Sequence, residues 1–171
     1  MPTRWPRIVV AMFCSLLAAV TSAYGDRADD LKGLDGFGSV VITLGDRDDA
    51  KAFGLYEERL RTLAELTLRR EGLLVSGQRT GFVSVTVRVV KLTTGQQETV
   101  AGGAFVVILG AGAWLKADPY RAGQTVAATL WASSNIAARP QKSVADGVDE
   151  VLRQLLDTLL NDYYKANPKA R

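Results

Sequence analysis

Histidine is missing from the 171-residue sequence, and cysteine occurs only once, as Cys14. Without histidine the chain lacks the commonest general base, the usual zinc ligand and the base of a Ser-His-Asp triad. Cys14 lies in an N-terminal apolar run that we interpret below as a cleaved signal, so the remaining chain would also lack thiols and disulfides. We therefore expect no metal and no other cofactor, whereas Ser-Lys or two-carboxylate catalysis stays open.

The N-terminus has the pattern of a cleavable secretory signal. Arg4 and Arg7 are basic, and the apolar run 8–20 follows them. Small residues, Thr21 and Ala23, come next at the spacing that signal peptidase needs. The run is shorter than the roughly 18 apolar residues of a membrane span, which argues against an uncleaved anchor. We predict a signal peptide and a periplasmic or secreted product.

The predicted cleavage sites set the domain boundaries. Cleavage after Ala23 fits the small-residue spacing best, and cleavage after Gly25 is the second choice. We predict a signal peptide over residues 1–23, a loose and polar lead-in over residues 24–37, and a single α+β domain over residues 38–168. This domain is large enough to bury one ordinary core.

Charge gives little support for a nucleic-acid partner. The whole chain has 21 Lys and Arg residues against 18 Asp and Glu residues. Cleavage removes Arg4 and Arg7, which leaves 19 basic and 18 acidic residues and a nearly neutral product. The chain contains no block of like charge either, so we expect no nucleic acid among its partners.

Hydrophobic periodicity predicts a mixed fold. Alternating or continuous apolar runs predict strands over residues 38–44, 73–76, 82–92, 98–109 and 124–132. Helical spacing predicts helices over residues 55–70 and 144–165, with a charged loop at 45–54 and a turn at 117–123. This order favours an α+β two-layer sandwich, in which a mostly antiparallel sheet carries both helices on one face.

Several patterns make these elements specific. In 82–92 the odd-numbered valines alternate with Ser84, Thr86 and Arg88, which predicts one buried face. Residues 104–109 are apolar on both faces, which predicts a central strand. Gly72 occupies the position of a left-handed cap, and Ser143 with Asp146 resembles a capping box. One apolar stripe predicts that the last helix packs on the core; it consists of Val144, Val148, Val151, Leu152, Leu155, Leu159 and Tyr163.

Two patterns that resemble ligand sites do not meet the requirements of such sites. Asp46, Asp48 and Asp49 lack the alternating series and the distal Glu of a calcium-binding hand, so a solvated loop is favoured. Gly110 and Gly112 lack the third glycine and the helix start of a dinucleotide loop, so they indicate bends in a strand.

The candidate binding residues are Trp131, Trp114, Tyr120 and Arg88. In 124–132, Val126, Ala128 and Leu130 form one face, while Thr125, Thr129 and Trp131 form the other. This alternation predicts that Trp131 lies on the sheet face away from the helices, where aromatic side chains mark binding surfaces. Because large aromatics dominate ordinary cores, the alternative is that both tryptophans cover edges of the core.

Three segments carry a resemblance to known proteins. LLNDYYKANP at 159–168, LTLRREGLLV at 66–75 and ATLW at 128–131 resemble parts of a set of small exported bacterial proteins of unknown function. The resemblance covers most of the chain after the signal, and it implies a bacterial envelope or secreted origin. It brings no catalytic residue with it.

These observations favour a non-enzymatic periplasmic binding or protein-interaction domain, with another envelope protein as its partner. Its surface would be the open sheet face or an exposed edge strand. The first alternative is a carrier of a small apolar ligand between helices and sheet, with room provided by the Ala and Gly residues of 101–113. The second alternative is an enzyme that works without histidine or cysteine.

Overall fold

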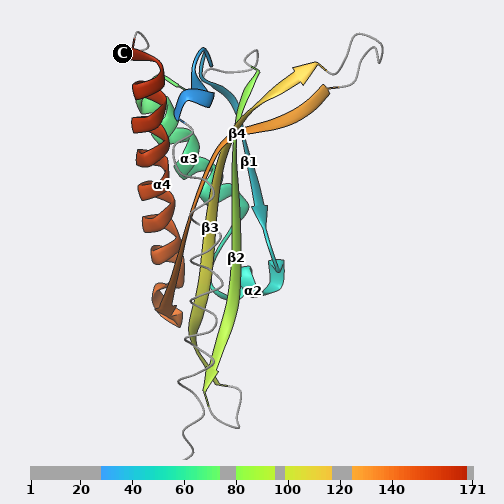
Figure 1. The fold of residues 1–171 in the computed structure, drawn as a ribbon. Coiled ribbons are helices and arrows are strands. Elements are labelled where there is room, and N and C mark those ends of the chain that lie inside the picture. The colour runs from blue at the N-terminus through green and yellow to red at the C-terminus, as the bar shows by residue number, and fades with distance from the viewer. Residues whose placement is uncertain (1–27, 74–79, 95–98, 117–124, 169–171) are drawn as a thin grey trace, which may run out of the picture.

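The computed structural model describes residues 28–73, 80–94, 99–116 and 125–168. Four strands, in the spatial order β1-β2-β3-β4, form one sheet (Figure 1). They are β1 (Phe37–Leu44), β2 (Gly81–Thr94), β3 (Thr99–Lys116) and β4 (Thr125–Pro140). β1 pairs with β2 in parallel, and the two other pairs are antiparallel. The sheet is therefore mostly antiparallel, as the sequence predicts.

Helices cover one side of this sheet. The long ones are α3 (Glu57–Arg70) and α4 (Val144–Ala166); the short ones are η2 (Ala28–Leu31), α2 (Arg47–Ala52) and η3 (Gln141–Ser143). Both α3 and α4 contribute to the same buried cluster as the sheet, and α4 runs alongside the strands (Figure 1). This arrangement confirms the predicted α+β fold. Within the described ranges, no helix combines the length and hydrophobicity that a membrane span requires.

The core lies between the sheet and the two long helices. On β2 the valines at 83, 85, 87 and 89 are all buried, as their alternation predicts. All seven residues of the predicted stripe on α4 are also buried. α3 buries Leu60, Ala64 and Leu68, and Gly72 follows it with a positive φ of 69°, which suits a glycine after a helix end. β3 lies between β2 and β4, which confirms its central position.

The segment before β1 differs from the predicted loose lead-in. Residues 28–31 form η2, and Leu31 is completely buried. The hydroxyl of Tyr163 donates to the carbonyl of Leu34 at 2.6 Å. The side chain of Asn167 donates to the carbonyl of Leu31 at 2.9 Å and accepts from the amide of Gly33 at 2.8 Å. The end of α4 therefore holds this polar segment against the core.

The predicted charged loop at 45–54 contains a helix, α2. The Asp46 carboxylate accepts from the amides of Asp48 and Asp49 at 3.1 and 3.2 Å, which caps the helix N-terminus. The carboxylate of Asp49 forms an ion pair with Lys91 on β2. These acidic residues therefore start and anchor a helix, and Ala50, which follows Asp49, is buried.

Two further local predictions need correction. Ser143 does not form a capping box, because its hydroxyl donates to the carbonyl of Pro140 at 3.3 Å and caps no helix amide. The last strand extends to Pro140, well beyond the predicted end at residue 132. Leu73 lies outside any strand, while residues 74–76 and the turn at 117–123 fall outside the described residues.

Candidate interaction surface

The side of the sheet opposite the buried cluster carries no described helix, and we call it the open face. Register and alternation place the even-numbered residues 82–92 of β2 and 102–114 of β3 on this face. Val41 of β1 pairs beside Ser84, and Ile136 of β4 pairs beside Val106, so they lie on the same face. The open face therefore extends across all four strands.

The open face is rich in exposed apolar side chains. Six large hydrophobic residues on it are between 39% and 63% exposed. They are Val41, Val90, Leu92, Ile108, Trp114 and Ile136. A solvated antiparallel sheet normally shows polar residues at such positions. An apolar set of this kind marks a surface that another molecule covers.

Charge is scarce on the same face. Among the residues placed above on β2 and β3, and among their pairing partners on β1 and β4, Arg88 is the one charged side chain. A Cβ atom added to Gly45 would lie 2.9 Å from Cγ of Arg88. The stem of Arg88 thus passes over Gly45, just beyond the end of β1. Arg88 pairs with Val106, which pairs with Ile136, so its backbone lies in one row with two apolar residues of the face while its stem leans toward the end of β1.

Glycines leave part of the open face without side chains. Gly102, Gly110 and Gly112 all lie on it. A Cβ atom at Gly112 would lie 2.7 Å from Cζ of Phe82, so the Phe82 ring occupies that space. Trp114 packs on Phe82 with ring centroids 5.1 Å apart and planes tilted by 43°. Phe82 is thereby buried, while Trp114 keeps 42% of its surface exposed.

Trp131 does not belong to this surface, and its predicted placement on the exposed face is wrong. Ala111 pairs with Trp131 and Gly112 pairs with Thr129, so Leu130 is an extra residue in β4. Such a bulge moves every later side chain to the opposite face. Trp131 is only 4% exposed in the core, and its indole N–H donates to the Asp162 carboxylate of α4 at 2.9 Å.

Beyond this bulge the paired ends of β3 and β4 turn away from α4 (Figure 1). Trp114 lies on this arm. Arg88 is six residues along β2 from Phe82, which is about 20 Å at 3.3 Å per residue. The predicted residues Trp114 and Arg88 therefore share a face but not a common site, and Tyr120 lies outside the described residues.

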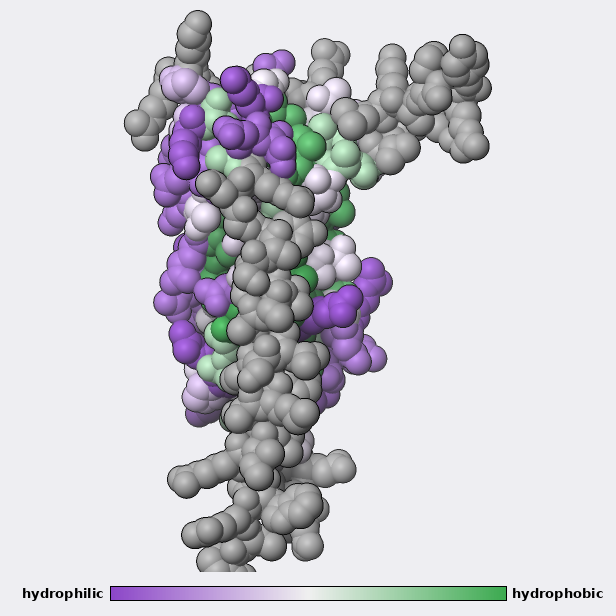
Figure 2. All heavy atoms as spheres, viewed as in Figure 1, coloured by the Kyte–Doolittle hydropathy of each residue, from purple (hydrophilic) through white to green (hydrophobic). Residues whose placement is uncertain are grey.

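The sequence analysis selected aromatic residues and therefore missed the aliphatic residues of the open face. Val90 and Leu92 continue the even-numbered side of β2 after Arg88, and Ile108 pairs opposite Thr86. Combining the alternation of the two strands would have placed these residues on one face. Figure 2 shows hydrophilic residues gathered on the outer side of α4 and around α2, with hydrophobic residues visible between them.

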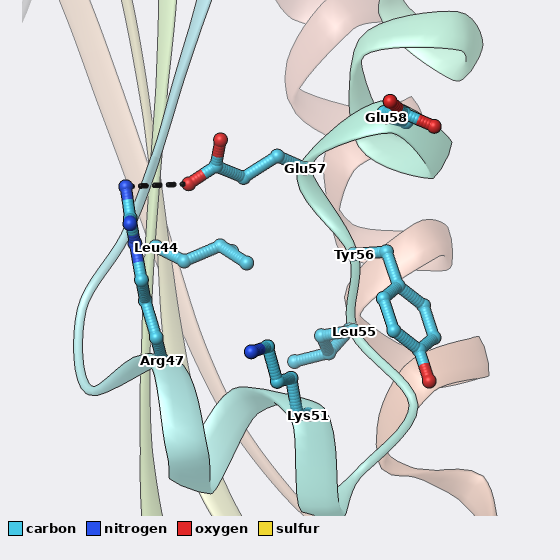
Figure 3. A pocket seen from close by; sticks show the side chains of 7 residues that line it. All are labelled: Leu44, Arg47, Lys51, Leu55, Tyr56, Glu57 and Glu58. Carbon is cyan, nitrogen blue, oxygen red and sulfur yellow. Dashed lines mark ion pairs between the residues drawn. The ribbon is translucent and has the colours of Figure 1, made fainter.

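A separate pocket of about 340 Å³ lies where α2 meets the start of α3 (Figure 3). Leu44 and Leu55 form apolar parts of its wall, and Lys51 extends toward it. Arg47 bridges it through an ion pair with Glu57 at 3.3 Å. Tyr56 and Glu58 point away from its interior in Figure 3. The pocket is partly open and its lining combines both charge signs, so it indicates no particular class of ligand.

An ion pair between an exposed arginine and a buried aspartate joins the two long helices. Arg59 on α3 donates to Oδ2 of Asp149 on α4 at 2.6 Å, and its guanidinium lies 3.6 Å from Asp146. The hydrogen bond from Asp149 raises the pKa of Arg59, partial burial opposes this shift, and the charges of both aspartates add to it. The pair fixes the contact between the helices. In the described ranges, no three acidic residues come together as metal ligands would.

The described residues define a small α+β domain with one covered sheet face. No protein-family model matches the chain, and no curated protein matches it. Similar solved structures include a dodecamer of a PelC variant from Paraburkholderia phytofirmans, with 17% identity, a TM-score of 0.42, and coverage of 77% of this chain and 88% of that chain. Rare lipoprotein B from Shewanella oneidensis has 12% identity, a TM-score of 0.37, and coverage of 77% and 98%. A minor lipoprotein from Acinetobacter baumannii has 11% identity, a TM-score of 0.29, and coverage of 78% and 95%. At these TM-scores the likeness carries no functional argument.

Proposed function

We propose that this protein is an exported, non-enzymatic interaction domain that docks a protein partner on its open face. The observation that carries the proposal is the set of six half-exposed apolar side chains on a face with one charge. The partner would present a flat apolar surface with few charges, because such a surface buries apolar area without leaving charges unpaired.

The fold supports docking on this face. A two-layer sandwich covers one side of its sheet and leaves the other to solvent. Val90, Ile108 and Ile136 expose 63%, 39% and 45% of their surface at positions where polar residues would suffice for solubility. Monomeric proteins rarely expose large contiguous apolar patches, and such patches mark interaction sites.

The carrier of an apolar ligand receives less support. The layer between helices and sheet is occupied by packed side chains: Val107 and Leu109 from β3 and Leu152 and Leu156 from α4 are completely buried in one cluster. The exposed ring of Trp114 instead lies on the open side. These contacts favour an interaction surface over a ligand-filled interior.

Export supports an envelope partner. The basic N-terminus, the short apolar run and the small residues before residue 24 are the pattern of a cleaved signal. Docking on the open face would then take place in the periplasm or outside the cell.

Cysteine labelling in intact cells tests the proposal, since the chain after the signal has no cysteine. Ile136→Cys places a thiol on the open face, and Leu66→Cys places one on the exposed side of α3. The two native residues are 45% and 49% exposed, so the pair is matched. We expect a maleimide to label Ile136→Cys much more slowly than Leu66→Cys in cells. Equal rates would show that nothing covers the open face and would refute the proposal.

A further inference from the structure

We propose that the outer edge of β4 pairs with the same edge of a second copy of this chain, so that the two sheets continue into one. This inference concerns the edge of the sheet and goes beyond the proposed function. The two-fold axis of such a pair is perpendicular to the sheet, so the open faces of both copies stay uncovered.

β4 is a long edge strand with little protection against pairing. It is the last strand in the order β1-β2-β3-β4 and has 16 residues, whereas strands in globular proteins usually have about 5–6. Natural edge strands are kept short or carry charged residues, prolines or bulges. Residues 125–138 contain no charged residue and no proline, and Arg139 and Pro140 come only at the end of the strand. After the bulge at Leu130, the pairing with β3 is regular.

The hydrogen bonds of β4 indicate which of its backbone groups face outward. In an antiparallel ladder, residues that bond the neighbouring strand alternate with residues whose backbone groups point away. The amide of Ile136 donates to the side-chain oxygen of Asn135 at 2.8 Å, so it points away from β3. Pro140, four positions later in the same alternation, has no N–H to donate to β3. The backbone groups of residues 132, 134, 136 and 138 therefore face outward.

No strand lies beside these outward groups. Within the part of the chain that the structure describes, every backbone-to-backbone hydrogen bond of β4 belongs to its ladder with β3. Ser134, Asn135, Ile136 and Ala138 are exposed, so this stretch of the edge is accessible. An edge of this kind can accept a further strand, whose N–H and C=O groups bond the free ones.

The composition of the edge favours a second copy as the source of that strand. A two-fold axis at Asn135 sets residues 132–138 of both copies antiparallel, so that the outward groups of each copy meet those of the other. Such pairing brings identical residues close together, and it is repulsive where they are charged. This stretch is uncharged, and the two Arg139 residues would lie about 26 Å apart along the strands, at 3.3 Å per residue. Another protein's strand would not require a neutral edge, because opposite charges on the two strands attract.

Ile136 would add a side-chain contact to the pairing. It is 45% exposed and lies next to the proposed axis. The two Ile136 side chains would be diagonal neighbours on the same face, about 7–8 Å apart, which long side chains can bridge. The amide of Ile136 would exchange its bond to Asn135 for a bond to a backbone carbonyl of the second copy.

The test is the mass of the purified exported protein over a series of concentrations, measured by analytical ultracentrifugation. We expect a reversible equilibrium between monomer and dimer. Ser134→Lys places two ammonium groups beside the axis and should weaken the dimer by about tenfold or more, because lysine on an edge strand opposes pairing. The matched control is Val90→Lys, at a 63% exposed position on the interior strand β2, and it should dimerise like the wild type.

Exchange of charge identifies the second strand as a copy of the first. Ser134→Asp should dimerise as poorly as Ser134→Lys, whereas an equal mixture of the two variants should form a dimer, because opposite charges then meet beside the axis. Ser134→Pro removes an outward amide without removing a bond to β3, so it should also prevent pairing. Thermal melting of each variant confirms that it is folded.

The outcomes decide the inference separately from the proposed function. A wild-type monomer at the highest soluble concentration overturns the edge dimer, and so does a dimer that Ser134→Lys and Ser134→Pro leave intact. A dimer that Val90→Lys dissociates also overturns it, because the contact would then lie on the open face. Pairing at the edge would partly shield Ile136, whereas Ile108 on β3 lies away from the edge. Slow labelling of Ile108→Cys in cells therefore reports docking on the open face, whatever the mass of the purified protein.

Discussion

Two tryptophans on neighbouring strands occupy opposite environments. Trp131 fills the core under α4 and donates a hydrogen bond to Asp162, whereas Trp114 covers Phe82 on the open face. The difference arises from one inserted residue, Leu130, since alternation along β4 would otherwise have placed both rings on the same side.

Trp131→Ala should lower the free energy of unfolding by about 3–5 kcal/mol, because it removes a buried aromatic ring and leaves a cavity. Trp114→Ala should cost clearly less, because nearly half of its ring surface is exposed. Urea denaturation of both variants checks this order. Equal losses would mean that Trp131 is not part of the core.

The ion pair between α3 and α4 gives a second prediction at this scale. Arg59→Met should destabilise the protein by about 1–3 kcal/mol, because it leaves the buried Asp149 without its cation. Arg61 is exposed on the same helix, so Arg61→Met is the control and should have little effect. A loss of stability from Arg61→Met that matches Arg59→Met would contradict a specific role for the pair.

The pH dependence of this contribution follows from the raised pKa of Arg59. A group whose pKa is raised in the folded state stabilises that state below its unfolded pKa and loses the contribution only as pH rises through the folded pKa. For an arginine this window is strongly alkaline. Protonation of Arg59 should therefore contribute no change in stability between about pH 6 and pH 9, as thermal melts can measure.

At the scale of the elements, α4 is the main support of the sheet. Its apolar stripe faces the strands, and its charged side faces solvent. Leu155→Ala should cost about 2–5 kcal/mol, the usual range for truncating a buried leucine. Arg153→Ala, on the exposed side, should change the melting temperature little. A small effect of Leu155→Ala would mean that the helix does not pack as described.

Elements with one buried face could be predicted from the sequence, because burial imposes a period on their residues. The stripe of α4 and the valines of β2 follow their periods without interruption. The helix α2 could have been predicted from Asp46, which stands at the position of a helix cap. The bulge at Leu130 could not be predicted from the sequence, because neither the residue type nor the spacing marks the extra residue. The residues that share the open face could not be predicted from one strand alone, because the pairing register between strands decides which side chains lie next to one another.

The structure of the segment before β1 could not be predicted from the sequence for a different reason. Residues 28–35 include four acidic or basic side chains before the first strand, and their composition is that of a loop. Leu31 becomes buried only because Tyr163 and Asn167, more than 120 positions later, hold the backbone around it. Contacts between distant segments of this kind leave no local pattern.

For the whole molecule, the most direct prediction concerns its maturation. The N-terminus of the protein isolated from intact cells should begin at Tyr24 or Asp26, because the small residues before these positions suit signal peptidase. N-terminal sequencing or intact mass spectrometry measures this. Isolation of a soluble protein that still begins with Met1 would exclude a cleaved signal.

The side chain of Asn167 makes completion of the fold depend on synthesis of the segment that follows α4. It binds the backbone of Gly33, 134 positions earlier in the chain. A ribosome that adds about 5–20 residues per second needs about 7–27 seconds to cover this distance. Until α4 has emerged, the segment around Leu31 has no partner to hold it, and the sheet lacks its main cover. The domain therefore stays without its finished core until α4 has been made, and a segment in that state is what a translocation channel for unfolded polypeptides requires.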